Sequence, residues 1–154
     1  MIKKLDHEKL DRAIEIQNVF QLSYKVEAAL LNAKEFPPLK RSLTEFIGSK
    51  NDFYGFLIDD VLAAVIEIKS TKKVTHIQSL VVLPTFFRRG IAQNILDFTF
   101  TNFDTALFTV ETGAANLPAT ALYKKNGFVE ISQYNAQFDI RKVRFEKTIR
   151  TIKY

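Results

Sequence analysis

The segment from Leu80 to Ala92 joins an apolar run to a loop that holds one glycine and two adjacent arginines. An apolar-periodic stretch follows Gly90, so the sequence predicts a strand, a loop and a helix that begins beside this glycine. The first N–H groups of a helix lack intrahelical acceptors and carry the positive end of the helix dipole. Arg88 and Arg89 add charge, and Gly90 allows close backbone approach. This combination suits an anion, with pyrophosphate as the natural ligand.

Other phosphate and metal chemistries find less support in the sequence. It contains neither G-x-x-x-x-G-K-[ST] nor G-x-G-x-x-G, the loops typical of nucleoside triphosphate hydrolysis and dinucleotide hydride transfer. With no cysteine and two histidines, we expect no tightly bound structural zinc. A lone glycine after a strand also occurs in loops that bind nothing, so spacing alone leaves a purely structural role open.

Two segments together resemble the GNAT-type N-acetyltransferases, which use acetyl-CoA. Residues Phe87 to Ala92 (FRRGIA) resemble that family's pyrophosphate motif [QR]-x-x-G-x-[GA], although Phe87 replaces Gln or Arg at its first position. Residues Asn116 to Phe128 are similar to the family signature N-x-x-A-x-x-L-Y-x-x-x-G-F. The two motifs stand in the family's order and separation.

The resemblance implies an α/β fold whose mixed, mostly antiparallel sheet is splayed at its centre and flanked by four or so helices. Acetyl-CoA would enter between the strand ending at Leu83 and the strand ending at Glu111. The family's helical asparagine, which contacts the pantetheine arm, corresponds to Asn116, and its tyrosine near the thioester sulfur corresponds to Tyr123. The cofactor-binding residues expected on this basis are Leu80, Val81, Val82, Arg88, Arg89, Gly90, Ile91, Ala92, Gln93, Asn116 and Tyr123.

A tyrosine in that position has a clear chemical use. Its phenol can hydrogen-bond the developing thiolate and return a proton as the tetrahedral intermediate collapses. Direct transfer to an amine requires no Ser or Cys nucleophile. The alternative is that Tyr123 only anchors the core through its ring.

The acceptor ammonium must lose a proton before it can attack, either to a side chain or to a water chain. His76, Glu67 and Glu111 fall on strands expected to line the acceptor side. His76 is the candidate base, because its unperturbed pKa of about 6.5 suits neutral pH. Several family members also place a general-base carboxylate near this point. In the alternatives, His76 is a half-exposed residue at the start of a strand, and Glu67 lies on the solvent face of an alternating strand.

The remaining pattern predicts helices and strands that would hold these residues. We expect one long helix or two over 7–32, ended by Phe36-Pro37-Pro38, and a short helix from the capping box Ser42/Glu45 to Gly48. The other expected helices follow Gly90 and span Asn116 to Asn126. The expected strands are Asp52 to Ile58, Val61 to Lys69, Val74 to Leu83, Ala106 to Glu111, Phe128 to Tyr134 and Arg141 to Ile152.

Length, composition and charge limit the class of protein to which the sequence can belong. The 154 residues carry 47% hydrophobic side chains, and we expect a single domain over 1–154. The formal net charge of +5 favours anionic partners. We expect no membrane span, no signal segment and a cytoplasmic setting, since no apolar run approaches the length of a bilayer. The closing strand pair could support a homodimer.

The sequence therefore predicts an N-acetyltransferase that moves an acetyl group directly from acetyl-CoA to a primary amine of a small molecule or peptide. One alternative is a CoA-binding sensor without catalysis. Another is a nucleic-acid-binding module that uses Phe86 to Arg89 and the basic C-terminal strand, with strongly salt-dependent binding. The acceptor cleft is expected from the N-terminal helices and the 32–41 loop, whose sequence does not identify the acceptor.

Overall fold

Seven strands form one mixed, mostly antiparallel sheet in the order β1-β2-β3-β4-β5-β7-β6, within residues 1–149, the part of the chain that the computed structural model describes. The strands are β1 (Ile2–Lys4), β2 (Asp52–Ile58), β3 (Val61–Ser70), β4 (Val74–Val82), β5 (Leu107–Gly113), β6 (Val129–Asn135) and β7 (Arg141–Thr148). The helices are α1 (Leu10–Leu30), α2 (Leu43–Ile47), α3 (Ile91–Asn102) and α4 (Leu117–Lys125). The expected sheet type and helix number are confirmed.

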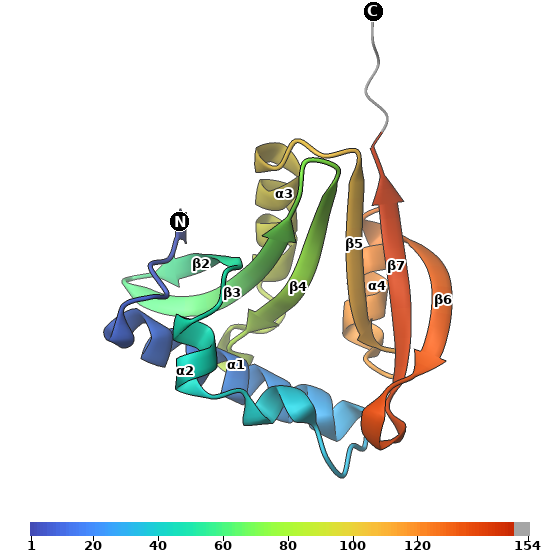
Figure 1. Cartoon of the computed structure of the whole chain (residues 1–154), viewed down its shortest axis with the longest axis horizontal. Helices are drawn as coiled ribbons and strands as arrows, with labels where there is room; N and C mark the ends of the chain where they lie inside the picture. The colour runs from blue at the N-terminus through green and yellow to red at the C-terminus, as the bar shows by residue number, and fades with distance from the viewer. Residues whose placement is uncertain (150–154) are drawn as a thin grey trace, which may run out of the picture.

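Helices cover both faces of the sheet (Figure 1). On one face, α1 and α2 contribute Phe20 and Phe46 to a core that includes Val65 of β3. On the other face, α3 and α4 contribute Ile95 and Tyr123 to a second core that includes Ile66. Because successive strand residues point to opposite faces, β3 is buried on both sides, from Leu62 to Ile68. Within residues 1–149, no helix has the length and apolarity needed to span a membrane.

The centre of the sheet opens between β4 and β5. These parallel strands pair only from Val74 opposite Leu107 to Ile77 opposite Val110. Beyond that point they diverge toward α1, as Figure 1 shows. A bulge lies at the start of the divergence, since Glu67 and Ile68 of β3 face Ser79 and Ile77 and leave Gln78 without an opposite residue. The splay predicted from the resemblance is therefore present.

Several local signals end or begin elements where the sequence places them. The Ser42 hydroxyl accepts the Glu45 N–H at 3.1 Å, which completes the capping box of α2. Asn116 caps α4 in the same way, and Gly127 follows that helix at φ +86°. Strand β2 has the expected bounds.

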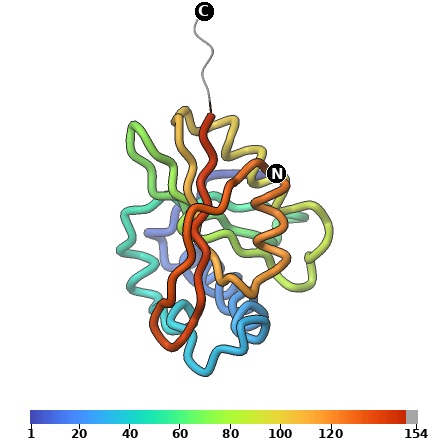
Figure 2. The backbone as a smooth tube through the Cα atoms, turned by 90° about the vertical axis from the view of Figure 1, so that its right-hand side faces the viewer, coloured from blue at the N-terminus to red at the C-terminus, as the bar shows by residue number. Residues whose placement is uncertain are grey.

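Other boundaries differ from expectation. The first helix is a single helix that ends at Leu30, before Phe36, and Asn32 takes a left-handed φ of 50° just after it. Strand β1 was not expected, because three residues are too few to display a period. The expected end of the last strand at Ile152 lies outside the described residues. The hairpin of β6 and β7 ends in a loop that reaches toward the segment after α1 (Figure 2).

Candidate active site

Two cavities meet where β4 and β5 diverge. The first, here called the loop-side cavity, has a volume of about 530 Å³ and lies against α1, the loop after it and the β6–β7 loop. The second, the helix-side cavity, has a volume of about 590 Å³ and extends to the N-terminus of α3. Five residues line both cavities and so mark their junction: Glu27, Leu80, Asn116, Ala119 and Tyr123.

The far end of the helix-side cavity presents free backbone donors. Gly90 is the N-cap of α3 at φ +73°, and its carbonyl accepts the Asn94 N–H at 3.0 Å. The N–H groups of residues 91–93 therefore lack intrahelical acceptors. A Cβ built on Gly90 would meet nothing within 4 Å, so the space beside this glycine is open. Arg88 also lines this cavity, and the arrangement can hold a phosphate or pyrophosphate.

The structure brings nine of the eleven expected cofactor-binding residues into the lining of the helix-side cavity. The two exceptions are Val81 and Arg89. Val81 is 1% exposed and packs in the core beneath α1, which leaves only its backbone for a ligand on this side. The Arg89 guanidinium lies over the Phe86 ring, 5.2 Å from its centroid. Phe86 itself lines the cavity, so Arg89 contacts the wall of this site through the Phe86 ring.

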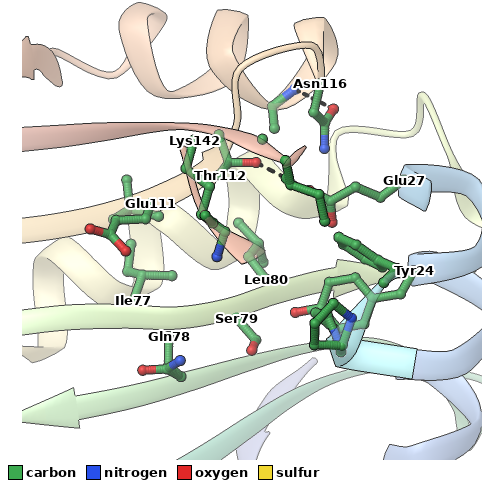
Figure 3. A pocket seen from close by; sticks show the side chains of 18 of the residues that line it. Tyr24, Glu27, Ile77, Gln78, Ser79, Leu80, Glu111, Thr112, Asn116 and Lys142 are labelled. Carbon is green, nitrogen blue, oxygen red and sulfur yellow. Dashed lines mark hydrogen bonds between the residues drawn. The ribbon is translucent and has the colours of Figure 1, made fainter. Parts of the chain in front are cut away.

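Asn116 has its side chain oriented by the helix that it caps. Its Oδ1 accepts the Ala119 N–H at 3.3 Å, which fixes the amide so that its nitrogen faces the cavity (Figure 3). Within residues 1–149, the cap leaves the two N–H donors of the Asn116 amide free for a ligand at the junction.

Tyr123 combines a packed ring with a hydroxyl at the junction. The ring contacts Phe128 and Phe145 with centroids 5.5 and 6.0 Å apart, so the core-anchoring interpretation of this residue is correct for the ring. No atom of residues 1–149 forms a hydrogen bond with the hydroxyl. Burial raises the pKa of Tyr123, and the negative charge of Glu27 raises it further. The phenol therefore remains protonated at neutral pH and can donate a hydrogen bond to a ligand.

The loop-side cavity has two walls from loops. Phe36, Pro37 and Pro38 line it, as expected for the segment after α1. Ala136, Gln137 and Ile140, from the loop between β6 and β7, also line it. Sequence reasoning missed this second wall, because a hairpin loop has no periodicity and only the sheet order brings it beside α1.

Glu67 lies in this cavity's wall and is fully buried, so its expected place on a solvent face is wrong. The reason is that β3 is covered by helices on both faces. Its carboxylate accepts two hydrogen bonds from Arg41, one from Asn51 at 2.9 Å and one from Ser79 at 3.1 Å. With four donors around it, the Glu67 carboxylate is already satisfied within the protein.

His76 lines neither cavity. Its Nδ1 is hydrogen-bonded to Thr109 Oγ1 at 2.7 Å, where β4 and β5 are still paired. Burial lowers the pKa of His76; the charge of Glu111 opposes this shift, and the charges of Arg144 and Lys69 add to it. The imidazole is therefore neutral at neutral pH, but His76 lies four residues before Leu80, the β4 residue at the junction.

Glu111, the third candidate for the base, does line the loop-side cavity. Its carboxylate accepts a hydrogen bond from the Tyr134 hydroxyl at 2.9 Å and lies 3.9 Å from the Arg144 guanidinium. Both contacts hold the Glu111 carboxylate on the β6–β7 side of the cavity.

Comparison with known proteins gives consistent results. The model of the acetyltransferase (GNAT) domain matches residues 22–149. UPF0157 protein YqkA of Bacillus subtilis (strain 168) is 31% identical over 129 residues, which are 83% of this chain and 38% of that protein. The chain thus spans 38% of the length of this curated relative.

Solved structures show the same fold. The ribosomal-protein-S18-alanine N-acetyltransferase from Escherichia coli has a TM-score of 0.77 at 18% identity, covering 99% of this chain and 96% of that one. The PaiA N-acetyltransferase from Thermoplasma acidophilum, in complex with coenzyme A, has a TM-score of 0.75 at 16% identity, covering 97% and 98%. Because the family model covers most of the sequence, the resemblance is confirmed, and the chain belongs to the GNAT acetyltransferase family.

Proposed function

We propose that this protein transfers an acetyl group directly from acetyl-CoA to a primary amine of a small molecule or peptide. The observation that carries the proposal is the meeting of two cavities at one junction, lined by Tyr123 and Asn116. One cavity leads to the N–H groups at the start of α3, and the other is lined by two loops. A donor and an acceptor can therefore approach the junction from opposite sides.

In this proposal the residues of the helix-side cavity bind acetyl-CoA. The N–H groups of residues 91–93 and the Arg88 side chain bind the pyrophosphate. The amide nitrogen of Asn116 donates to the pantetheine arm. The fold match to a GNAT enzyme solved in complex with coenzyme A supports this assignment.

Tyr123 acts on the leaving group. The neutral amine attacks the carbonyl carbon of the thioester, a C–N bond forms, and the C–S bond breaks. The departing sulfur takes a proton from the Tyr123 hydroxyl, which regains one from the nitrogen of the new amide. The raised pKa of Tyr123 favours this role, because a protonated phenol is required at the moment when the thiolate forms.

His76 remains our proposed acceptor of the proton that the ammonium must first lose. Since it lines neither cavity, the proton would reach it through water near the splay point. Its lowered pKa keeps the imidazole neutral and able to accept.

The direct test is purified protein with acetyl-CoA and a panel of primary amines, followed by thiol release and mass spectrometry of the products. We expect acetyl-CoA to bind and at least one amine to be acetylated. Binding without release for every amine would indicate a CoA sensor. Absence of acetyl-CoA binding in calorimetry would reject the proposal altogether.

A further inference from the structure

Some of the charged side chains that line the loop-side cavity have charged or hydrogen-bonding partners within the protein that compensate them, and others do not. Arg41 and Glu67 pair with each other at 2.7 Å. Glu111 is bonded by the Tyr134 hydroxyl and lies near Arg144. These three side chains of the lining are therefore compensated by contacts within the protein.

Two charges of opposite sign remain in that lining, Glu27 and Lys142. Among residues 1–149, neither has an oppositely charged group within 4 Å. Glu27 accepts one hydrogen bond, from the Thr112 hydroxyl at 3.3 Å. Figure 3 shows the amino group of Lys142 pointing into the cavity. Both side chains are half-buried, and a half-buried charge without a partner costs free energy that a bound ligand could recover.

Glu27 and Lys142 place opposite charges at two different points of the loop-side cavity. Glu27 lines both cavities, so it lies at the junction where an acceptor amine would meet the thioester. Lys142, which lies on β7 opposite Gly113, lines only the loop-side cavity and not the helix-side cavity. A molecule that contacts both would therefore place its positive end at the junction and its negative end away from it.

We propose that the acceptor is an amine that also carries an anionic group, a carboxylate or a phosphate. Glu27 binds its ammonium at the junction, and Lys142 binds its anionic group. The inference rests on the acetyl transfer proposed above and specifies the class of acceptor for it. Lys142 acts as a point charge, so it accepts either anion without a fixed geometry.

The test compares acceptors that differ in charge, among which β-alanine, propylamine and 1,3-diaminopropane share a three-carbon chain. Glycine, β-alanine, 4-aminobutyrate and O-phosphoethanolamine carry an amine and an anion; propylamine carries no anion, and 1,3-diaminopropane carries a second cation. We expect kcat/KM to be about tenfold or more higher for the best anionic acceptor than for propylamine, as for a partly buried charge-assisted contact. The carboxylates and the phosphate in the panel distinguish the two anions.

Variants at Lys142 and Glu27 assign the preference to these residues, and a variant at Lys73 is the control. Lys142→Gln should lower kcat/KM for the anionic acceptor to the level of propylamine, and Lys142→Glu should favour 1,3-diaminopropane. Lys73→Gln, in the exposed turn between β3 and β4, is the matched control and should change nothing. Glu27→Gln should raise the KM for every acceptor.

The outcomes separate this inference from the proposed function. If propylamine is acetylated as well as the anionic amines, or if Lys142→Gln keeps the preference, the inference is wrong while acetyl transfer stands. If acetyl-CoA binds but no amine in a broad panel releases thiol, both proposals fail.

Discussion

Arg41 and Glu67 form a bidentate ion pair in which Nη1 and Nη2 of the guanidinium donate to the two carboxylate oxygens at 2.7 and 2.9 Å. Arg41 directly follows the 3-10 turn Pro37–Lys40, which belongs to the loop wall of the cavity, whereas Glu67 lies on central strand β3. The guanidinium also lies over the Phe46 ring, 4.2 Å from its centroid. The pair therefore ties the acceptor-side wall to the sheet and to α2.

Breaking this pair should be costly. Glu67→Gln leaves the Arg41 charge without its carboxylate, and removal of one partner of a buried pair typically destabilises by about 3 to 5 kcal/mol. Since the Arg41 side chain is 21% exposed, we expect about 3 kcal/mol, the lower end of that range. Urea unfolding measures the change. Glu111→Gln is the control, because its longer contact with Arg144 should be worth less than about 1 kcal/mol. Equal losses of unfolding free energy in the two variants would contradict a larger stabilising contribution from Glu67 than from Glu111.

Gly90 should matter for the ligand more than for the fold. Gly90→Val forces a β-branched residue to φ +73°, which costs about 1 to 2 kcal/mol, but its Cβ meets no neighbouring atom in the protein. Because Gly90 lines the helix-side cavity at the N-terminus of α3, we expect the added side chain to hinder a bound pyrophosphate. We expect acetyl-CoA affinity to fall about tenfold or more in calorimetry.

Gly127→Val is the matched control for that substitution. Gly127 has φ +86° and lies outside both cavities, so its variant carries similar backbone strain without touching the ligand. It should lose stability and keep its affinity for acetyl-CoA. Unchanged affinity in a folded Gly90→Val protein would remove the pyrophosphate from this site.

Tyr123→Phe should reduce turnover without unfolding the protein. The ring contacts with Phe128 and Phe145 persist, and only the hydroxyl at the junction is lost. General acid assistance is worth about 10² to 10⁴-fold, so kcat should fall in that range while the KM for acetyl-CoA changes little. Tyr54→Phe, whose ring packs on Phe98 and Phe103, controls for hydroxyl loss elsewhere. Turnover within about twofold of the unmodified protein would restrict Tyr123 to packing.

The sequence predicts well those features that depend on local chemistry. Asn116 and the Ser42/Glu45 box begin their helices because their side chains accept backbone N–H groups a few residues away. Helix α3 likewise begins beside Gly90, as the sequence predicts, and this glycine takes a left-handed φ of 73° there.

Features that depend on distant contacts are not visible in the sequence. Glu67 looks like an exposed strand residue until both faces of β3 are known to be covered. Its partner Arg41 is 26 residues away, and no pattern joins them. Glu27 and Lys142 come from the first helix and the last strand, so only the folded chain brings them to one cavity.

His76 should make stability depend on pH. Burial lowers its pKa in the folded protein below the ordinary value of about 6.5. At a pH between the folded and unfolded pKa values, the imidazole is protonated in the unfolded chain and neutral in the folded one. The free energy of unfolding therefore falls as pH decreases through this window. His76→Asn, which can keep a hydrogen bond to Thr109, should show a smaller loss of stability between pH 7 and pH 5 in urea unfolding. Parallel curves for the two proteins would contradict the pKa shift.

The same variant tests the route of the acceptor proton. If His76 accepts that proton through water, His76→Asn should lower kcat/KM at pH 7, where most of the amine is protonated. Activity should recover at higher pH, where the amine loses its proton without help. Thr109→Val, which removes the Oγ1 partner of the ring but keeps the imidazole, should retain most of the rate at pH 7. A pH–rate profile of His76→Asn with unchanged height and shape would show that water alone removes the proton. The position of His76 outside both cavity linings would account for that result.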